Sequence, residues 1–264
     1  MPVTINTNTA ASTAARALEV ANKNLTDSLK KLSTGNRIVN AYDDAAGESV
    51  QLKLKSQSAR YDVLKANLMN GISFLEVQGG VVDAAIDALT RIGELNALSG
   101  DVTKSSDDIA LYSTESALLD ALIRTNLEAE TFNGNALFGT AVNVNINIAG
   151  TAQSIGGQSL NTAVAQDYTD LSTPITAANY ETDMQNLATI KATIGAQQSA
   201  LNYYYDNAVV TQSNVNAARG RIVDLDIATE SGVYAREQIL AQAAASMLSQ
   251  ANNIGAQAAM SLLM

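Results

Sequence analysis

The sequence predicts a mainly α-helical protein whose two halves build one long antiparallel helical bundle or coiled coil, with a small β-hairpin region in the middle. Apolar residues recur every seven positions in two distant segments. Proline occurs only at Pro2 and Pro174, so residues 3–173 contain nothing that must break a helix. The chain of 264 residues is 47% hydrophobic but only 5% aromatic, which is typical of helices packed through Ala, Leu, Ile and Val.

The first heptad segment predicts one helix from about Asp44 to Leu98. Its residues spaced by seven are Leu54, Tyr61, Leu68, Leu75, Val82 and Leu89, and Leu64, Ala85 and Ile92 occupy the intervening heptad position. At about 1.5 Å per residue this helix is roughly 80 Å long. A helix of that length needs partners to bury its apolar face.

A second helix is expected to fold back on the first. The sequence SGDVTKSSD at residues 99–107 predicts a break, followed by a helix N-cap at Ser105 or Ser106. The helix then continues to about Ala129. Its apolar residues are Leu111, Leu118 and Leu122.

The second heptad segment, near the other end of the chain, predicts the partner of the first. Its residues spaced by seven are Leu187, Ile194, Leu201, Ala208, Val215 and Ile222. Because the two segments come from opposite halves of the chain, they are expected to pair in one antiparallel bundle. The region between them is then an insertion.

The middle of the chain has the pattern of a small hairpin with a loop. Val142, Val144, Ile146 and Ile148 alternate with Asn143, Asn145 and Asn147. A sequence rich in Gly, Ser and Thr follows, up to Pro174. The asparagines are interpreted as the solvated face of a strand.

Both terminal segments carry an apolar stripe and little charge. In the first segment the stripe is Leu18, Leu25, Leu29 and Leu32. In the last segment its larger members are Ile239, Met247, Leu248, Ile254 and Leu262. Between them lie mostly small residues, which let helices approach closely. These helices are expected to pack on each other and on neighbouring copies of the chain.

Composition excludes several kinds of chemistry. The chain has no Cys, His or Trp, which removes disulfides, thiol nucleophiles, imidazole bases and most zinc sites. Its net charge of -10 disfavours nucleic acid, which binds clustered Lys and Arg. We therefore expect no catalytic site, metal, cofactor or nucleic-acid partner.

Neither end of the sequence predicts a membrane segment. The start, MPVTINTNTAASTAAR, lacks the basic and then apolar pattern of a secretory signal peptide, so export would need another route. From Gln238 to Met264 there is no charged residue, a length that can span a bilayer. Repeated Gln, Asn and Ser side chains disfavour a span, because buried amides without partners are costly.

Four blocks of the sequence resemble bacterial flagellins. LSTGNRIVNAYDDAAG, at Leu32 to Gly47, closely resembles the family signature. TFNGNALFG, at Thr131 to Gly139, is similar to the segment that closes the second core helix. ARGRIVDLDIATE, at Ala218 to Glu230, and then QILAQAAASMLSQAN with the final SLLM, resemble the C-terminal region.

The resemblance implies a domain organisation that matches the division reached from the residues. Residues 1–43 and 225–264 form an inner terminal-helix domain in the filament core, and residues 44–138 and 179–224 form a helical rod. Residues 139–178 are a short insert in place of larger outer domains. A spoke linking core and rod contains Arg37, Asp43, Asp44 and Asp226.

By the same resemblance, the chain is exported unfolded by the flagellar type III apparatus to an extracellular filament. An export chaperone guards its C-terminus, and hook-junction and filament-cap proteins are further partners. The family also presents a surface to the vertebrate Toll-like receptor for flagellin. The matching residues are Arg91, Leu95 and Glu115, although Gly93 and Asn96 depart from the common pattern. Arg91 and Glu115 are equally well explained as solvated charges on facing helices.

The resemblance also makes hydroxyl groups of the insert candidates for O-linked glycans. These are Ser154, Ser159, Thr162, Thr169, Ser172 and Thr173.

The acidic residues of the linking segments have a structural explanation. Asp43 and Asp44 are expected to satisfy free N–H groups at a helix start, and Arg37, Arg219 and Arg221 to pair with the nearby carboxylates. General acid–base catalysis would require a pocket, for which the sequence gives no sign. The DLD of residues 224–226 lacks the spacing of a calcium loop.

The function predicted is that of a structural subunit which polymerises into the flagellar filament for swimming motility, with its terminal helices folding as the polymer forms. Two alternatives remain open. A hook-filament junction protein shares the terminal helices but caps the rod in few copies, and a secreted coiled-coil adaptor or adhesin forms a discrete oligomer instead of an open lattice.

Overall fold

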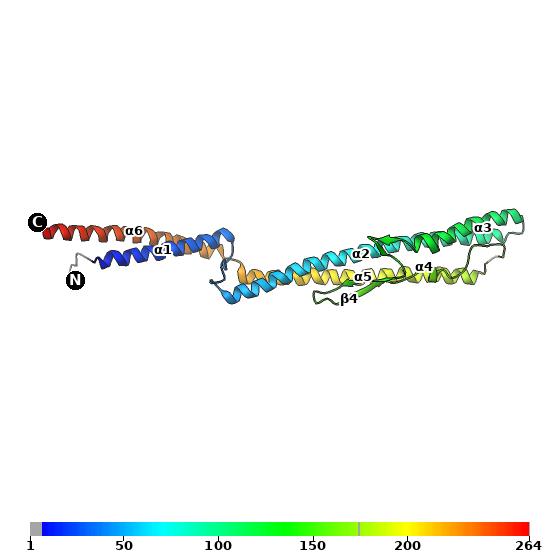
Figure 1. Ribbon diagram of the computed structural model, residues 1–264, viewed down its shortest axis with the longest axis horizontal. Coiled ribbons are helices and arrows are strands. Elements are labelled where there is room, and N and C mark those ends of the chain that lie inside the picture. The colour runs from blue at the N-terminus through cyan, green and yellow to red at the C-terminus, as the bar shows by residue number, and fades with distance from the viewer. Residues whose placement is uncertain (1–6, 174, 264) are drawn as a thin grey trace. The chain divides into compact units, whose positions relative to one another are not determined.

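The computed structural model describes residues 7–173 and 175–263, and the chain divides into two compact units (Figure 1). Unit 1 holds residues 1–56 and 214–264, and unit 2 holds residues 57–213. The long helices are α1 (Thr9–Thr34), α2 (Ala45–Ser99), α3 (Ser106–Ala121), α5 (Ala177–Val223) and α6 (Ile227–Leu263). The mainly α-helical class with a small β region is confirmed.

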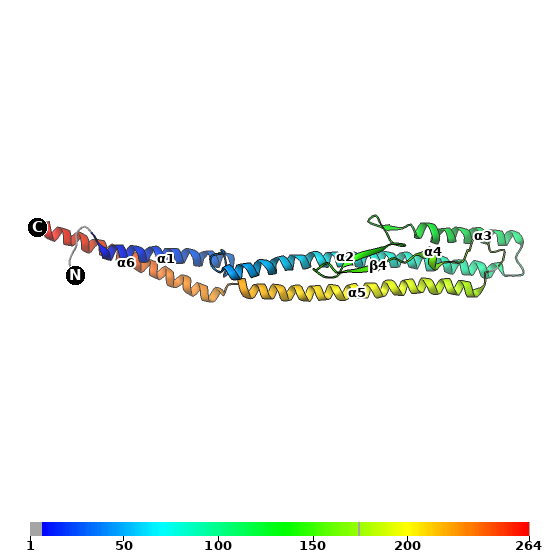
Figure 2. The same ribbon diagram turned by 60° about the horizontal axis from the view of Figure 1, so that its bottom comes forward.

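In unit 1 the two ends of the sequence pair as antiparallel helices. α1 and α6 lie side by side in both views (Figure 1, Figure 2). Asn8 Nδ2 donates to Ala251 O at 2.9 Å near one end of the pair, and Ser28 Oγ donates to Glu230 Oε1 at 2.6 Å near the other. The buried side chains of α1 are small, those of Ala21 and Ser28, so the helices approach closely.

Unit 2 is organised around α2 and α5, which run in opposite directions. The predicted heptad residues form its core. On α2, Leu68, Leu75, Val82 and Leu89 are fully buried, and on α5 the buried series is Leu187, Ile194, Leu201 and Ala208. Gln212 donates to Ser58 O at 3.0 Å and Gln198 to Glu76 at 3.4 Å, which fixes the antiparallel register.

The second predicted helix begins where expected but buries a different face. Ser105 is the N-cap of α3 and forms a capping box with Asp108. Hydrogen bonds from the backbone N–H and the hydroxyl of Ser105 lower the pKa of Asp108. Leu111 and Leu118, two of the three apolar residues noted in this segment, are about 70% exposed. Ser116, Asp120 and Ile123 lie inward instead.

After Ala121 the helix widens into a π-helix, η1 (Leu122–Leu127), which the sequence did not predict. Two short strands follow, β1 (Thr131–Phe132) and β2 (Asn135–Ala136). Asn133 and Gly134 both have positive φ, as a two-residue hairpin turn of the mirror type requires.

The predicted hairpin of the insert is present. β3 (Ala141–Asn145) pairs antiparallel with β4 (Ala152–Gly156). Val144 faces the core and Asn143 and Asn145 are exposed, as the alternation predicted. Asn147 Oδ1 closes the connection by accepting from the N–H groups of Ala149 and Thr151, each at 3.0 Å.

Residues 157–171, predicted as loop, pack against the helices of unit 2. They contain a single helical turn, α4 (Leu160–Ala163), and contribute the buried side chains of Leu160, Ala163, Val164, Tyr168 and Leu171. Asp183, on α5, is only 2% exposed and holds this segment. Its carboxylate accepts from Ala165 N at 3.2 Å, Gln166 N at 3.1 Å and the Tyr168 hydroxyl at 3.0 Å.

Gly71 of α2 is expected to tolerate no larger side chain. A Cβ there would lie 2.9 Å from Val144 Cγ2 and 3.2 Å from Leu201 Cδ1, both buried. Gly71→Ala should lower the free energy of unfolding, measured by urea titration, by about 1–3 kcal/mol. Gly80→Ala is the matched control, because nothing lies within 4 Å of its Cβ position. It should raise stability by about 0.5–1 kcal/mol, and equal behaviour of the two variants would contradict the packing argument.

Candidate subunit-assembly surface and linker

The two linking segments of unit 1 are hydrogen-bonded to each other. Arg37 N donates to Val223 O at 2.6 Å, and Leu225 N donates to Gly35 O at 3.0 Å. Gly35 ends α1 in the left-handed conformation, with φ 69°, which turns the chain toward α5. The segment that follows α1 and the segment that follows α5 are therefore hydrogen-bonded to each other at the points where each one turns.

Arg37 ties two helix ends together across this linker. Its Nε and Nη2 donate to Ile222 O, at 3.2 and 2.7 Å, in the last turn of α5. Its Nη2 also lies 3.6 Å from the carboxylate of Asp44, which precedes α2. A cation is favourable at a helix C-terminus, where carbonyl groups lack intrahelical partners.

Two of the three linker carboxylates cap helices. Asp44 Oδ1 accepts from Gly47 N at 2.8 Å in the first turn of α2. Asp226 accepts from the N–H of Ala228 and the hydroxyl of Thr229 at the start of α6, and the contacts with Thr229 lower its pKa. Asp43 accepts from the N–H groups of residues 39 and 40 within the linker. The contacts of Asp44 and Asp226 agree with the expected role at a helix start. Asp43 does not have that role, because the N–H groups that it binds belong to the linker. Arg219 donates to Gln51 rather than to a carboxylate.

The terminal helices leave much of their predicted apolar stripe uncovered. Leu18, Leu25, Leu32 and Leu248 are partly buried. Leu29, Ile239, Met247 and Ile254 are between 51% and 66% exposed. Val20, Leu240 and Met260 add to this surface although the sequence stripe did not single them out. The side chain of Leu262 lies outside the described residues.

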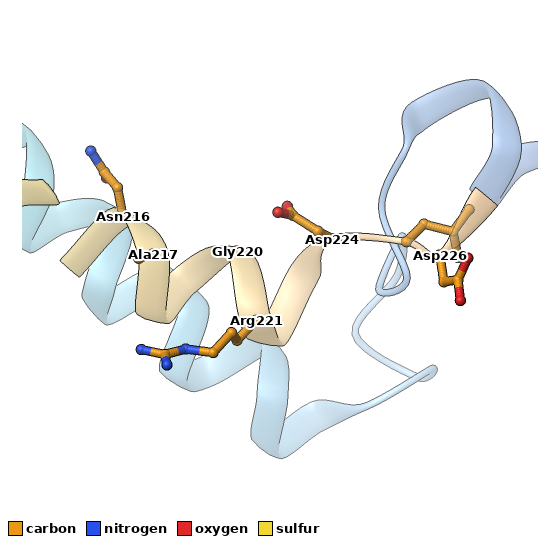
Figure 3. Close-up of a pocket in the computed structure, with 7 residues that line it drawn as sticks. Asn216, Ala217, Gly220, Arg221, Asp224 and Asp226 are labelled. Atoms are coloured by element: carbon orange, nitrogen blue, oxygen red, sulfur yellow. The ribbon is translucent and has the colours of Figure 1, made fainter. Parts of the chain in front are cut away.

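A hollow lies at the end of α5, in unit 1. It has a volume of about 430 Å³ and is lined by residues 216, 217, 220, 221 and 224–226. Figure 3 shows Arg221, Asp224 and Asp226 pointing in different directions, so they do not converge on one point. Among the described residues no cluster of three or more acidic side chains has the arrangement of a metal site. No helix in the described part combines the length and apolar content needed to cross a bilayer.

Comparison with known proteins identifies the family. Family models of the N-terminal and the C-terminal helical regions of bacterial flagellin match residues 5–143 and 177–263. The chain belongs to the bacterial flagellin family. This is a family of filament structural proteins rather than of enzymes.

Relatives within the flagellin family align over nearly the whole chain. The flagellar filament 33 kDa core protein of Treponema phagedenis is 31% identical over 285 residues, which is 98% of this chain and 99% of that protein. The 30.7 kDa core protein of Treponema maltophilum is 30% identical, with 94% and 95% coverage. A solved structure of a putative flagellar hook-associated protein from Vibrio parahaemolyticus has a TM-score of 0.58, covers 69% of this chain and 100% of its own, and at 14% identity shows the shared fold alone.

The surface that the flagellin resemblance assigned to an innate receptor is only partly accessible. Arg91 Nε donates to Glu115 Oε1 at 2.8 Å, and its Nη1 donates to Glu94 at 2.8 Å. Both acceptors raise the pKa of Arg91. Leu95 is 1% exposed because it packs inward from α2, so its inclusion in a receptor-contacting surface is wrong. Recognition through Arg91 and Glu115 stays a prediction.

The candidate glycan sites differ in accessibility. Ser154, Thr162, Thr169, Ser172 and Thr173 are exposed. Ser159 is partly buried and donates to Glu128 Oε1 at 2.9 Å while its oxygen caps α4. A glycan on Ser159 would remove the hydroxyl hydrogen that is donated to Glu128, whereas the other five residues stay open candidates.

Replacing Arg37 with Ala is expected to loosen the linker. The variant loses the donors to Ile222 O, so the adjacent amides of residues 37 and 225 should exchange hydrogen about tenfold faster, corresponding to roughly 1.4 kcal/mol. Hydrogen exchange read by mass spectrometry measures this. Arg16→Ala, an exposed position on α1, is the control. Equal protection of the linker in both variants would show that Arg37 does not hold it.

Proposed function

We propose that this protein is the structural subunit of a bacterial flagellar filament, and that polymerisation completes the burial of its terminal helices. The observation that carries the proposal is the uncovered apolar surface of α1 and α6. Side chains such as Ile239 and Met247 are each 66% exposed in the single chain. Burying a large aliphatic side chain contributes about 1.5–3 kcal/mol, so neighbouring copies that cover this surface would stabilise both the polymer and the helices.

The relatives support the same function. The aligned Treponema proteins are named as flagellar filament core proteins. Their full-length alignment favours a filament subunit over a hook-filament junction protein, because the likeness to the hook-associated protein concerns the fold alone. A discrete coiled-coil adaptor would cover the same apolar residues of α1 and α6 in a closed set of copies, and what favours the open polymer over it is the alignment with filament core proteins.

The proposed function includes export and accessory partners. The subunit is secreted through the flagellar type III route to an extracellular filament. An export chaperone, hook-junction and filament-cap proteins and, for Arg91 and Glu115, the Toll-like receptor for flagellin are proposed partners. The domain boundaries at residues 43/44 and 224/225, where the chain passes between helices, and the insert at residues 139–178 remain part of this proposal.

Electron microscopy of the purified chain tests the function. The protein is mixed with its own fragmented filaments as seeds under salting-out conditions, and growth is followed by microscopy and sedimentation. Long helical filaments are expected. A monodisperse dimer or tetramer at every concentration would exclude the filament function and favour the adaptor.

A further inference from the structure

Methionine is the only sulfur-containing residue type of the chain. The sequence has six Met and no Cys, so the thioether groups are its sites for oxidation at sulfur. Met1 and Met264 lie outside the described residues. The structure places the side chains of the other four, which are Met69, Met184, Met247 and Met260.

These four thioethers differ in how easily an oxidant in solution reaches them. Met184, on α5, is partly buried against the core of unit 2. Met69, on α2, is 47% exposed. Met247 and Met260, both on α6, are 66% and 63% exposed. Among the described residues, the two most accessible thioethers therefore lie on the helix that carries the proposed assembly surface.

Met247 is the centre of an exposed apolar row along α6. Leu240, Met247 and Ile254 follow one another at intervals of seven residues, about two helical turns, and are 48%, 66% and 57% exposed. The row runs beside the partly buried positions of α6 that have the spacing of the face toward α1, which are Ala241, Ala244, Leu248 and Ala251. A neighbouring copy can therefore cover Met247 without separating α6 from α1.

We propose that the thioether of Met247 is a redox control site: a peroxide converts it to the sulfoxide in the unassembled chain, and the sulfoxide hinders entry of that chain into the filament. The inference rests on the proposed function, because only the polymer covers Met247. The sulfur lone pair attacks one oxygen of hydrogen peroxide, the S–O bond forms as the O–O bond breaks, and sulfur loses two electrons to the peroxide. The proton of the transferred oxygen passes to the leaving hydroxide, which becomes water.

The chemistry of the row explains why one oxygen atom is enough. Oxidation turns a flexible apolar side chain into a strongly polar hydrogen-bond acceptor. In the single chain water solvates that acceptor. In the polymer it would be buried among apolar side chains, and from Gln238 to Met264 the sequence has no Lys or Arg to donate to it. A buried acceptor without a donor is unfavourable, so the oxidised chain binds its neighbours more weakly.

Partition of lightly oxidised chains tests the proposal on the unmodified sequence. The monomer is treated with hydrogen peroxide until most oxidised chains carry a single sulfoxide, polymerised on unoxidised seeds and sedimented. Peptide mass spectrometry reads the ratio of sulfoxide to thioether at each Met. At Met247 this ratio should be about tenfold lower in filaments than in the supernatant. At Met69, which is exposed in unit 2, the two ratios should be equal.

Reversal and protection give two further readouts. Methionine sulfoxide reductases, with dithiothreitol as the electron donor, remove the oxygen as water and should return the excluded chains to filaments. Peroxide added to finished filaments should oxidise Met247 about tenfold more slowly than in the monomer, because neighbouring copies then cover it.

A substitution separates the polarity of the sulfoxide from other effects of peroxide. Met247→Gln puts a polar side chain of similar length at the position, and Gln is a good helix former. Its critical concentration for seeded polymerisation should be about tenfold higher than that of the unmodified chain. Met69→Gln is the matched control and should polymerise as the unmodified chain does. Circular dichroism of both monomers should be unchanged, because both positions are exposed.

Four results would each overturn the redox site and leave the filament function standing. They are equal sulfoxide at Met247 in filaments and supernatant, equal exclusion of sulfoxide at Met247 and Met69, equal oxidation of Met247 in filaments and monomers, and normal polymerisation of Met247→Gln. Excluded chains that stay excluded after reduction would overturn it as well. Failure of the unmodified, unoxidised chain to polymerise would overturn both the site and the filament function.

Discussion

Removing residues 240–264 is expected to abolish filament formation while unit 2 stays folded. The deletion takes away most of α6, including the exposed apolar side chains of Met247 and Ile254. It also removes the partner of the first part of α1, where Asn8 donates to Ala251 O. An isolated helix of that length is marginal in water, so the start of α1 should unfold in the truncated chain.

Sedimentation and electron microscopy measure the loss of filaments, and urea unfolding followed at the tyrosines of unit 2 measures its stability. The truncated chain should show an unchanged midpoint for unit 2 and no polymer at concentrations at least 100-fold above the critical concentration of the full chain, equivalent to more than about 2.7 kcal/mol per subunit. Filaments from the truncated chain would refute assembly through the C-terminal helix.

A full-length variant separates the loss of surface from the loss of helix. Ile239, Met247 and Ile254 are replaced together by Gln, which is a good helix former. More than half of each of these three side chains is exposed, so replacing them should leave α1 and α6 packed together. If the triple variant polymerises normally while the truncated chain does not, filament assembly requires the helix α6 itself but not these exposed apolar side chains.

The sequence predicted the elements that depend on local periodicity. The seven-residue series on α2 and α5 identified buried residues such as Leu75 and Leu201, because a helix repeats its environment at that spacing. The carboxylate of Asp44 was expected at a helix start, and it accepts from the N–H of Gly47 in the first turn of α2. Each of these features is decided by residues within a few positions of one another.

The errors lie where burial depends on distant partners. Leu95 is covered by unit 2, whereas the more conspicuous Leu111 and Leu118 remain exposed. On α3 the inward positions are instead polar, and Ser116 Oγ donates to Tyr168 O at 2.6 Å. No local pattern predicts that Ser116 is buried while Leu111 and Leu118 are exposed, because Ser116 is covered by a segment about fifty positions away that contains Tyr168.

The segment at residues 157–171 is the clearest case. It has no periodicity and many small polar residues, so it was predicted as a loop. Its position depends on two buried carboxylates on separate helices. Asp120 accepts from Arg124 Nε at 2.8 Å, and Arg124 Nη2 in turn donates to Gln166 O of the segment. Burial raises the pKa of Asp120 despite that partner. Asp183 accepts the backbone N–H groups that a loop would otherwise expose to water.

Replacing Asp183 with Ala is therefore expected to release this segment from unit 2. The substitution leaves the Tyr168 hydroxyl, which lies on a fully buried residue, and the N–H groups of residues 165 and 166 without their acceptor. Hydrogen bonds to a charged acceptor contribute about 1.5–3 kcal/mol each, and breaking such a buried set typically costs about 3–5 kcal/mol. The free energy of unfolding of unit 2 should fall by that amount.

Matched variants distinguish the carboxylate from its surroundings. Tyr168→Phe removes one of the three donors and keeps the ring, so it should cost only about 1 kcal/mol. Asp170→Ala removes an exposed carboxylate in the same segment, which is hydrogen-bonded to the backbone N–H and the side chain of the neighbouring Ser172, and it should leave the buried part of the segment in place.

Hydrogen exchange of residues 163–171 then separates release from general loss of stability. In Asp183→Ala these amides should exchange by local opening, faster than the core amides of α2 around Leu75, because the carboxylate anchors this segment more directly than it does the helix core. If instead all amides of unit 2 accelerate together, the segment is an inseparable part of the core. If none of them accelerates, Asp183 is not what holds the segment.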